Sequence, residues 1–179
     1  MQPSQASPNR YDYEVFADYH QITLEDCAGG MPRGDGTAKR AEEIDDAVSL
    51  QLDPPALARH LGVYPGVLCI LTARNMDVPL TVEVYDAAPQ DDLTAWDHVV
   101  EASLDVPSGC IRVSGGGGMF EASPEIRLAA GTYRARVYFG GVYTISNDGL
   151  DGSDHYRVVL WPGAPADPVV LHTVGNGEW

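Results

Sequence analysis

Cationic residues are scarce in this chain, and their scarcity excludes several common functions. The 179 residues include 26 acids but only 11 lysines and arginines, so the formal net charge is −15. Lys39 is the one lysine. A surface of this charge repels the phosphates of nucleic acids and of anionic lipids. The composition therefore argues against direct binding of nucleic acid or of a membrane surface.

Cysteines and long apolar runs are also few. Cys27, Cys69 and Cys110 lie far apart and are odd in number, which is neither a disulfide framework nor a zinc-binding spacing. No apolar run approaches the roughly 18 residues of a membrane-spanning helix. The first residues lack the cationic start and apolar block of a secretory signal. Together these absences predict a protein of the reducing cytoplasm.

Motifs that carry catalysis or bind cofactors are missing as well. The glycine-rich stretch Ser114–Phe120 is followed by no lysine, so it is not a phosphate-binding loop. His98 follows Asp97 and His155 follows Asp154, but consecutive strand residues point to opposite faces, so neither pair forms a ready-made general base. We predict no catalytic residue, no cofactor and no metal centre. A small hydrolase using His98 or His155 is the alternative.

The sequence is rich in short segments that alternate between apolar and polar residues. Leu80, Val82 and Val84 share one side of such a segment, and residues 133, 135, 137 and 139 share one side of another. Turns with glycine or proline separate these segments at a spacing of about ten residues. This pattern predicts a mainly β protein, an antiparallel β-sandwich of about eight strands. We expect a single domain over residues 11–179, after a disordered tail of residues 1–10.

The first third of the chain predicts one long strand and one or two short helices. Period-two alternation with aromatic residues extends over Tyr11–Glu25, which predicts a single strand with a bend. A short helix is predicted over Thr37–Ile44. A second short helix should start after Asp53, because an N-capping aspartate is followed by prolines and, later, by Gly62.

Acidic residues gather in the middle of the chain without cationic neighbours. Between Asn75 and Ile111 there are eight acids and no lysine or arginine. Carboxylates with no counter-charge repel one another, unless a partner's arginines and lysines complement them. We therefore predict an acidic face that binds a basic protein. Its proposed residues are Glu83, Asp91, Asp92, Asp97 and Glu101, with Trp96 as the central aromatic anchor. The alternative is a solvated face whose charge only keeps the protein soluble.

A second acidic stretch, Asn147–Asp154, precedes a strand-like segment. Asp148, Asp151 and Asp154 would extend the acidic face if this loop lies nearby. The spacing partly resembles a calcium-binding loop, but it lacks a side-chain oxygen at the third position, and Val158 stands where a bidentate glutamate belongs. A hairpin turn explains the same residues, because asparagine, aspartate and glycine tolerate positive φ angles. A ligand- or calcium-binding sandwich is the second functional hypothesis.

Two segments resemble the competence protein J family. They are DYHQITLED, Asp18–Asp26, and AAGTYRARVYFGG, Ala129–Gly141, which flank the acidic middle. The long middle insertion and the glycine loop depart from the family. Members of that family are small acidic cytoplasmic proteins that inhibit a DNA-entry nuclease. The resemblance implies a non-catalytic inhibitor or immunity protein for a basic nuclease or toxin, and it assigns no inhibitory residue.

Overall fold

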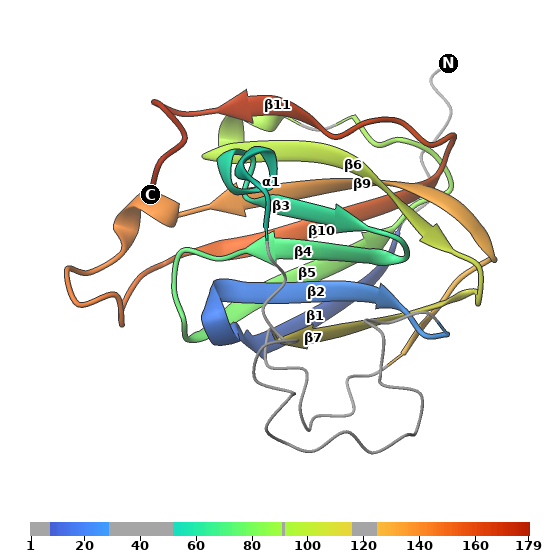
Figure 1. Ribbon diagram of the computed structural model, residues 1–179, viewed down its shortest axis with the longest axis horizontal. Coiled ribbons are helices and arrows are strands. Elements are labelled where there is room, and N and C mark those ends of the chain that lie inside the picture. Colours follow the sequence, from blue (N-terminus) through green and yellow to red (C-terminus); the bar gives the residue numbers. More distant parts are fainter. Residues whose placement is uncertain (1–7, 29–51, 91, 116–124) are drawn as a thin grey trace.

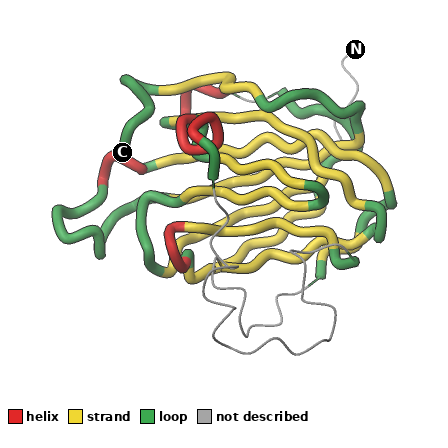
Figure 2. Tube along the Cα trace, in the orientation of Figure 1, coloured by secondary structure: helices red, strands yellow, loops and turns green. Residues whose placement is uncertain are grey.

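Two β-sheets facing each other make up the fold. The computed structural model describes residues 8–28, 52–90, 92–115 and 125–179 (Figure 1). Strands dominate and helices are short, as Figure 2 shows. The prediction of a mainly β sandwich is confirmed.

The larger sheet, sheet A, has six strands. In spatial order they are β1 (Asn9–Phe16), β5 (Asp77–Val84), β10 (His155–Pro162), β9 (Gly131–Gly140), β6 (His98–Val106) and β11 (Val169–Thr173). Sheet B has five strands, β3 (Leu61–Tyr64), β4 (Val67–Leu71), β2 (Gln21–Asp26), β7 (Cys110–Gly115) and β8 (Ile126–Arg127). Strand β5 pairs with β10 in parallel, whereas the other pairs among the described strands are antiparallel. Sheet A is therefore mixed, and sheet B is antiparallel.

The predicted single strand over 11–25 is wrong, because the chain forms two strands in different sheets. Strand β1 lies in sheet A and β2 in sheet B, joined by the short 3-10 turn η1 (Asp18–His20). Tyr19 and His20 have φ angles of 53° and 58°, the left-handed backbone that turns the chain from one sheet to the other. Strand β1 begins at Asn9, within the segment predicted as a tail, and residues 1–7 lie outside the described part.

The core fills the space between the two sheets. In the alternating segments recognised in the sequence, Leu80 and Val82 of β5 and Val137 and Phe139 of β9 are buried and belong to one apolar cluster. Ile22 of β2 reaches the same cluster from sheet B. Full burial of an aliphatic or aromatic side chain contributes about 1.5–3 kcal/mol. Burial of the inward-facing side chains of these alternating segments therefore stabilises the packing of the two sheets.

The described helical elements are short. Helix α1 (Pro54–Ala58) begins where the sequence predicted, with Asp53 Oδ1 accepting a hydrogen bond from Ala56 N at 2.8 Å. The remaining elements are the 3-10 turns η2 (Leu93–Ala95) and η3 (Val142–Thr144). The helix predicted over Thr37–Ile44 lies outside the described residues. No helix in the described part is long and apolar enough to cross a membrane.

A disulfide joins the two sheet-B strands β2 and β7. Cys27 and Cys110 are bonded, and Cys27 N also donates to Cys110 O at 2.9 Å, because Cys27 follows the last residue of β2 and Cys110 begins the neighbouring antiparallel strand β7. The expectation that the three cysteines form no disulfide is therefore wrong. Only Cys69 is free, and it is buried. The cysteines therefore no longer support a location in the reducing cytoplasm, and the cytoplasmic localisation stays a prediction.

Candidate functional site

Glu101, predicted to belong to an unpaired acidic face, is paired with two arginines. It lies on β6 directly opposite Arg136 of β9, and Arg136 Nη2 is 2.8 Å from Glu101 Oε2. Arg134 Nη2 is 2.8 Å from the other carboxylate oxygen. Each oxygen thus accepts hydrogen bonds from one guanidinium group. The two cations neutralise this carboxylate within the chain.

Glu83 is likewise paired, and only 6% exposed. Arg157 Nη2 on the neighbouring strand β10 lies 2.6 Å from Glu83 Oε2, and Arg10 Nη1 on β1 lies 3.6 Å from Oε1. The Tyr85 hydroxyl also donates to Glu83 at 3.2 Å. The outer face of sheet A, which carries these pairs, is therefore not the uncompensated acidic face that the sequence predicted.

Trp96 belongs to a small apolar cluster on this outer face. Its ring lies 5.1 Å from that of Tyr138 and 5.3 Å from that of His155, and it packs against the buried cluster that includes Val159 and Trp161. The Arg136 guanidinium lies over the Trp161 ring at 5.0 Å. Trp96 therefore covers the sheet and is half-buried. A role as a binding anchor stays a prediction.

Asp154 is also not available to a partner, because its side chain is fully buried. It is ion-paired with Arg74 Nε, and it accepts a hydrogen bond from the Tyr156 hydroxyl at 2.8 Å. Arg74 Nη1 also donates to Leu150 O at 3.2 Å. This pair fixes the loop 146–152 against the segment that joins β4 to β5.

Asp92 and Asp97 hold local structure and are accessible to different degrees. Asp92 is exposed and caps η2, accepting from Thr94 Oγ1 at 2.6 Å and from Thr94 N at 3.0 Å. The Thr94 hydroxyl bond lowers the Asp92 pKa. Asp97 is half-buried, and its Oδ2 accepts from Val142 N at 3.0 Å, which ties η3 to the start of β6. Asp91 lies outside the described residues.

Asp148 and Asp151 are exposed on a tight loop. Asp148 Oδ1 accepts from Ser146 Oγ at 2.6 Å and from Leu150 N at 3.2 Å, and the hydroxyl bond lowers the Asp148 pKa. Asp151 N donates to Ser146 Oγ at 2.9 Å, and Asp151 O accepts from Ser146 N at 2.8 Å. These are the contacts of a turn. The hairpin explanation therefore accounts for this loop.

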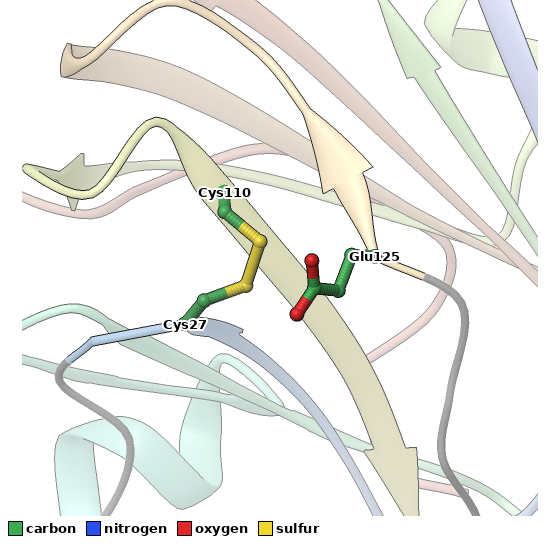
Figure 3. A group of neighbouring side chains, drawn as sticks. All are labelled: Cys27, Cys110 and Glu125. Atoms are coloured by element: carbon green, nitrogen blue, oxygen red, sulfur yellow. A yellow bond between two sulfur atoms is a disulfide. The ribbon is translucent and has the colours of Figure 1, made fainter.

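The described residues contain no cluster of carboxylates that would support the calcium-binding alternative. The one group of three possible metal ligands there is Cys27, Cys110 and Glu125, whose ligand atoms lie within 4.8 Å of one another. Figure 3 shows the Glu125 carboxylate beside the disulfide. Sulfur atoms joined in a disulfide offer no thiolate, which is the form that binds metal ions. Among the described residues, neither this group nor the loop 147–154 gathers three carboxylates that could bind calcium together.

The surface that does combine exposed acids with exposed apolar side chains is one end of the sandwich. We call it the loop end and define it as residues 16–20, 72–77 and 142–154, at the left of Figure 1. Thr72 N donates to His20 O at 2.9 Å, and the Arg74 contacts join the second segment to the third. The three segments therefore form one connected surface.

Four large apolar side chains are exposed at the loop end. Phe16 is 51% exposed, Tyr19 63%, Tyr143 47% and Leu150 52%. Four of its carboxylates, those of Asp18, Asp77, Asp148 and Asp151, form no ion pair with any described residue. Aromatic side chains within a polar rim are typical of protein-binding surfaces.

The prediction from the sequence included only part of this surface. It singled out Asp148 and Asp151 but missed Phe16 and Tyr19, because a period-two pattern with aromatics indicates a strand and not a turn. The backbone at Tyr19 is left-handed, which is uncommon for a residue with a bulky side chain. No local sequence signal marks it, since glycine, asparagine and aspartate are the usual residues at such positions.

The C-terminal residues pack beside this end against two histidines. The Trp179 ring stacks on His60 at 3.6 Å, and His60 Nε2 lies 2.7 Å from Gly177 O. His98 is 1% exposed, and its ring lies 5.3 Å from that of Trp179. Burial is the main cause that lowers the His98 pKa, to about 4, and repulsion from His60 and His172 lowers the pKa by a smaller amount. His98 is therefore neutral in the folded protein near neutral pH.

Acidification should therefore destabilise the fold through His98. The unfolded chain binds a proton at His98 near pH 6.5 and the folded chain only near 4, so stability is lost as the pH falls between these values. The expected loss by pH 4 is about 3 kcal/mol, measurable by urea unfolding. His98→Gln, which cannot titrate, should lose less stability over this range. Equal losses in both proteins would contradict the assignment.

Comparisons with known proteins show similarity of fold. No protein-family model matches the sequence, and no curated protein matches it. Among solved structures, ComJ from Bacillus subtilis, described as an inhibitor of the DNA degrading activity of NucA, superposes with a TM-score of 0.56. The match covers 89% of this chain and 99% of ComJ at 12% identity. The fold is similar to that of ComJ.

A second solved structure, Crocagin biosynthetic gene J, matches at a TM-score of 0.48 and 11% identity, covering 88% of this chain and 97% of that protein. The similarity to ComJ agrees, at the level of the fold alone, with the resemblance to the competence protein J family noted in the sequence. The low identity to ComJ gives no residue-level correspondence. What this chain binds has to be argued from its own surface.

Proposed function

We propose that this chain is a non-catalytic protein that binds and inhibits a nuclease. The observation that carries the proposal is the similarity in fold to ComJ, an inhibitor of a DNA-degrading activity, over 89% of this chain. The net charge of −15 supports the same role, because it favours association with a basic protein.

We assign the contact to the loop end. A nuclease holds the phosphates of DNA with cationic groups, and carboxylates on a binding protein can occupy the same groups. Asp148 and Asp151 are exposed and form no ion pair with the described residues, so their charges are available. Tyr19 and Phe16 supply the exposed aromatic surface. Long-range attraction would raise the association rate, and desolvated pairs would set the dissociation rate.

The remaining predicted residues that the structure describes, which exclude Asp91, divide into two groups. Glu83, Glu101 and Asp154 are engaged by arginines of the same chain, and we leave them out of the contact. Asp92 and Asp97, with Trp96 beside them, lie at the margin of the contact in this proposal. The contact is thus smaller than the sequence suggested and lies at the end of the sandwich.

Inhibition of DNA degradation tests this function. The purified protein is titrated against NucA and against any nuclease encoded beside its own gene, with ComJ and NucA as the positive control. We expect stoichiometric inhibition of at least one nuclease that weakens as salt is added, because the contact is electrostatic. Undiminished degradation by every nuclease at a large molar excess would contradict the proposal.

Charge reversal at the loop end should weaken binding strongly. The double variant Asp148→Lys/Asp151→Lys is expected to raise the Kd for the inhibited nuclease about a hundred-fold, since two attractive pairs become repulsive. The matched control is Asp105→Lys/Asp167→Lys, which makes the same change in net charge at two exposed residues outside the loop end. Titration calorimetry measures both. Equal losses would show that total charge matters and that the loop end does not.

A further inference from the structure

Strand β11 is an edge strand of sheet A, and its first three side chains are apolar. Among the described strands it pairs with β6 alone, at the end of the strand order. Val169, Val170 and Leu171 are 46%, 42% and 38% exposed. Figure 1 shows β11 along the outer margin of the sandwich, with no strand beyond it. Such an edge can pair with another strand through its free N–H and C=O groups.

Charged side chains protect the opposite edge of the same sheet, whereas β11 has an irregularity between Val170 and His172 but no acid, lysine or arginine. Strand β1 exposes Arg10, Asp12 and Glu14, and charged side chains oppose pairing with another strand. Between Asp167 and Glu178 the chain has no aspartate, glutamate, lysine or arginine. In a chain with a net charge of −15, the β11 edge of sheet A therefore carries no carboxylate, lysine or arginine, and His172 is its one titratable side chain.

We infer that the β11 edge binds a second copy of this chain, which pairs its own β11 antiparallel and joins the two six-stranded sheets into one. The edge is self-complementary about a twofold axis, because an antiparallel strand paired with itself presents identical groups on both sides. With β11 fully overlapped, Val169 lies opposite Thr173, and Leu171, which the irregularity in β11 leaves without a partner on β6, lies opposite Leu171. No charged residue faces another in this register.

The charge distribution selects a second copy over a basic partner. A cationic protein, as proposed for the loop end, would find no carboxylate on β11. Two copies, by contrast, bring the apolar side chains of β11 together at an edge without carboxylates, while the rest of their acidic surfaces repel. Salt screens this repulsion, so salt should strengthen the dimer. The nuclease complex should respond in the opposite sense, and the dimer does not depend on that proposal.

Sedimentation velocity of the full chain tests the inference. The wild-type protein is studied from low to high micromolar concentration, at low and at high salt, with Val170→Lys and Leu171→Lys alongside. We expect a species of twice 19.2 kDa that increases with concentration and with salt. Each lysine variant should raise the dimer dissociation constant at least about a hundred-fold, because the twofold axis doubles each unpaired charge.

A third variant controls for the added charge. Leu57→Lys places the same change on α1, at a side chain that is 50% exposed and lies outside β11, and it should dimerise like the wild type. Near-UV circular dichroism establishes that each variant is folded. A wild-type protein that is monomeric under all conditions overturns the inference. A dimer that persists in both β11 variants also overturns it. A dimer that Leu57→Lys weakens as much as the β11 variants do overturns it as well.

Discussion

Asp154→Ala is expected to lower the free energy of unfolding by about 3 to 5 kcal/mol, the usual cost of removing one partner from a buried ion pair. Asp154 is fully buried, and Arg74 is 11% exposed, so the guanidinium left behind would keep its charge with little access to water. The Tyr156 hydroxyl would lose its acceptor in the same variant. Urea unfolding at neutral pH measures the loss.

The matched control for this substitution is Asp151→Ala in the same loop. Asp151 is exposed and forms no ion pair with the described residues, so its loss should change stability by less than about 0.5 kcal/mol. The double variant Arg74→Met/Asp154→Leu, which removes both charges, should be less destabilised than Asp154→Ala, because no buried charge is left alone. Comparable losses in Asp151→Ala and Asp154→Ala would contradict the role assigned to the pair.

The pair also bears on the proposed function. Asp154 and Arg74 hold the loop that carries Asp148 and Asp151 against the segment beside η1. If the loop end is the contact, a destabilised pair should weaken nuclease binding indirectly, through loss of this arrangement. Binding measurements on Asp154 variants therefore have to be read together with their stability.

Reduction of the Cys27–Cys110 disulfide is expected to lower the free energy of unfolding by about 4 kcal/mol. The two cysteines are 83 positions apart, and closing so long a loop removes much conformational freedom from the unfolded chain. The bond also lies beside Asp26, which is 1% exposed and accepts hydrogen bonds from Ser108 N and Oγ at 3.0 and 2.6 Å. Loss of the bond should therefore loosen the β2–β7 corner first.

Unfolding by urea with and without dithiothreitol measures this effect. The double variant Cys27→Ser/Cys110→Ser should resemble the reduced protein and show no response to the reductant. Cys69 does not complicate the experiment, because burial raises the pKa of its thiol to about 12 and keeps it protonated. Identical unfolding midpoints with and without reductant would show that the bond does not constrain the chain.

The fold was largely predictable because its signal is local. Whether Leu80 and Val82 point inward depends on the two-residue period of their own strand, and that period is visible in the sequence. The Asp53 cap of α1 is local for the same reason. The break between β1 and β2 was missed, because the left-handed turn at Tyr19 and His20 uses residues that elsewhere favour strands.

Which carboxylates form ion pairs was not predictable from the sequence, because ion pairing depends on which strands become neighbours. The stretch from Asn75 to Ile111 contains no cation, yet Glu101 lies opposite Arg136, a residue 35 positions later in the chain. Glu83 meets Arg157 across the parallel β5–β10 pair. A count of charges within a window of sequence cannot detect such pairs, since strand order is decided by the whole fold.

By itself the sequence determined the fold class, the inward-facing residues of the strands, the helix that follows Asp53 and the large negative charge. Tertiary structure decided which carboxylates keep their charge available, by setting the arginines of β9 and β10 beside some of them. At the loop end it paired Asp154 with Arg74 and left Asp18, Asp77, Asp148 and Asp151 without an ion pair to any described residue. It also joined Cys27 to Cys110 and left β11 at an open edge. The reason is physical: periodicity depends on neighbours in sequence, whereas ion pairs, disulfides and sheet edges depend on neighbours in space.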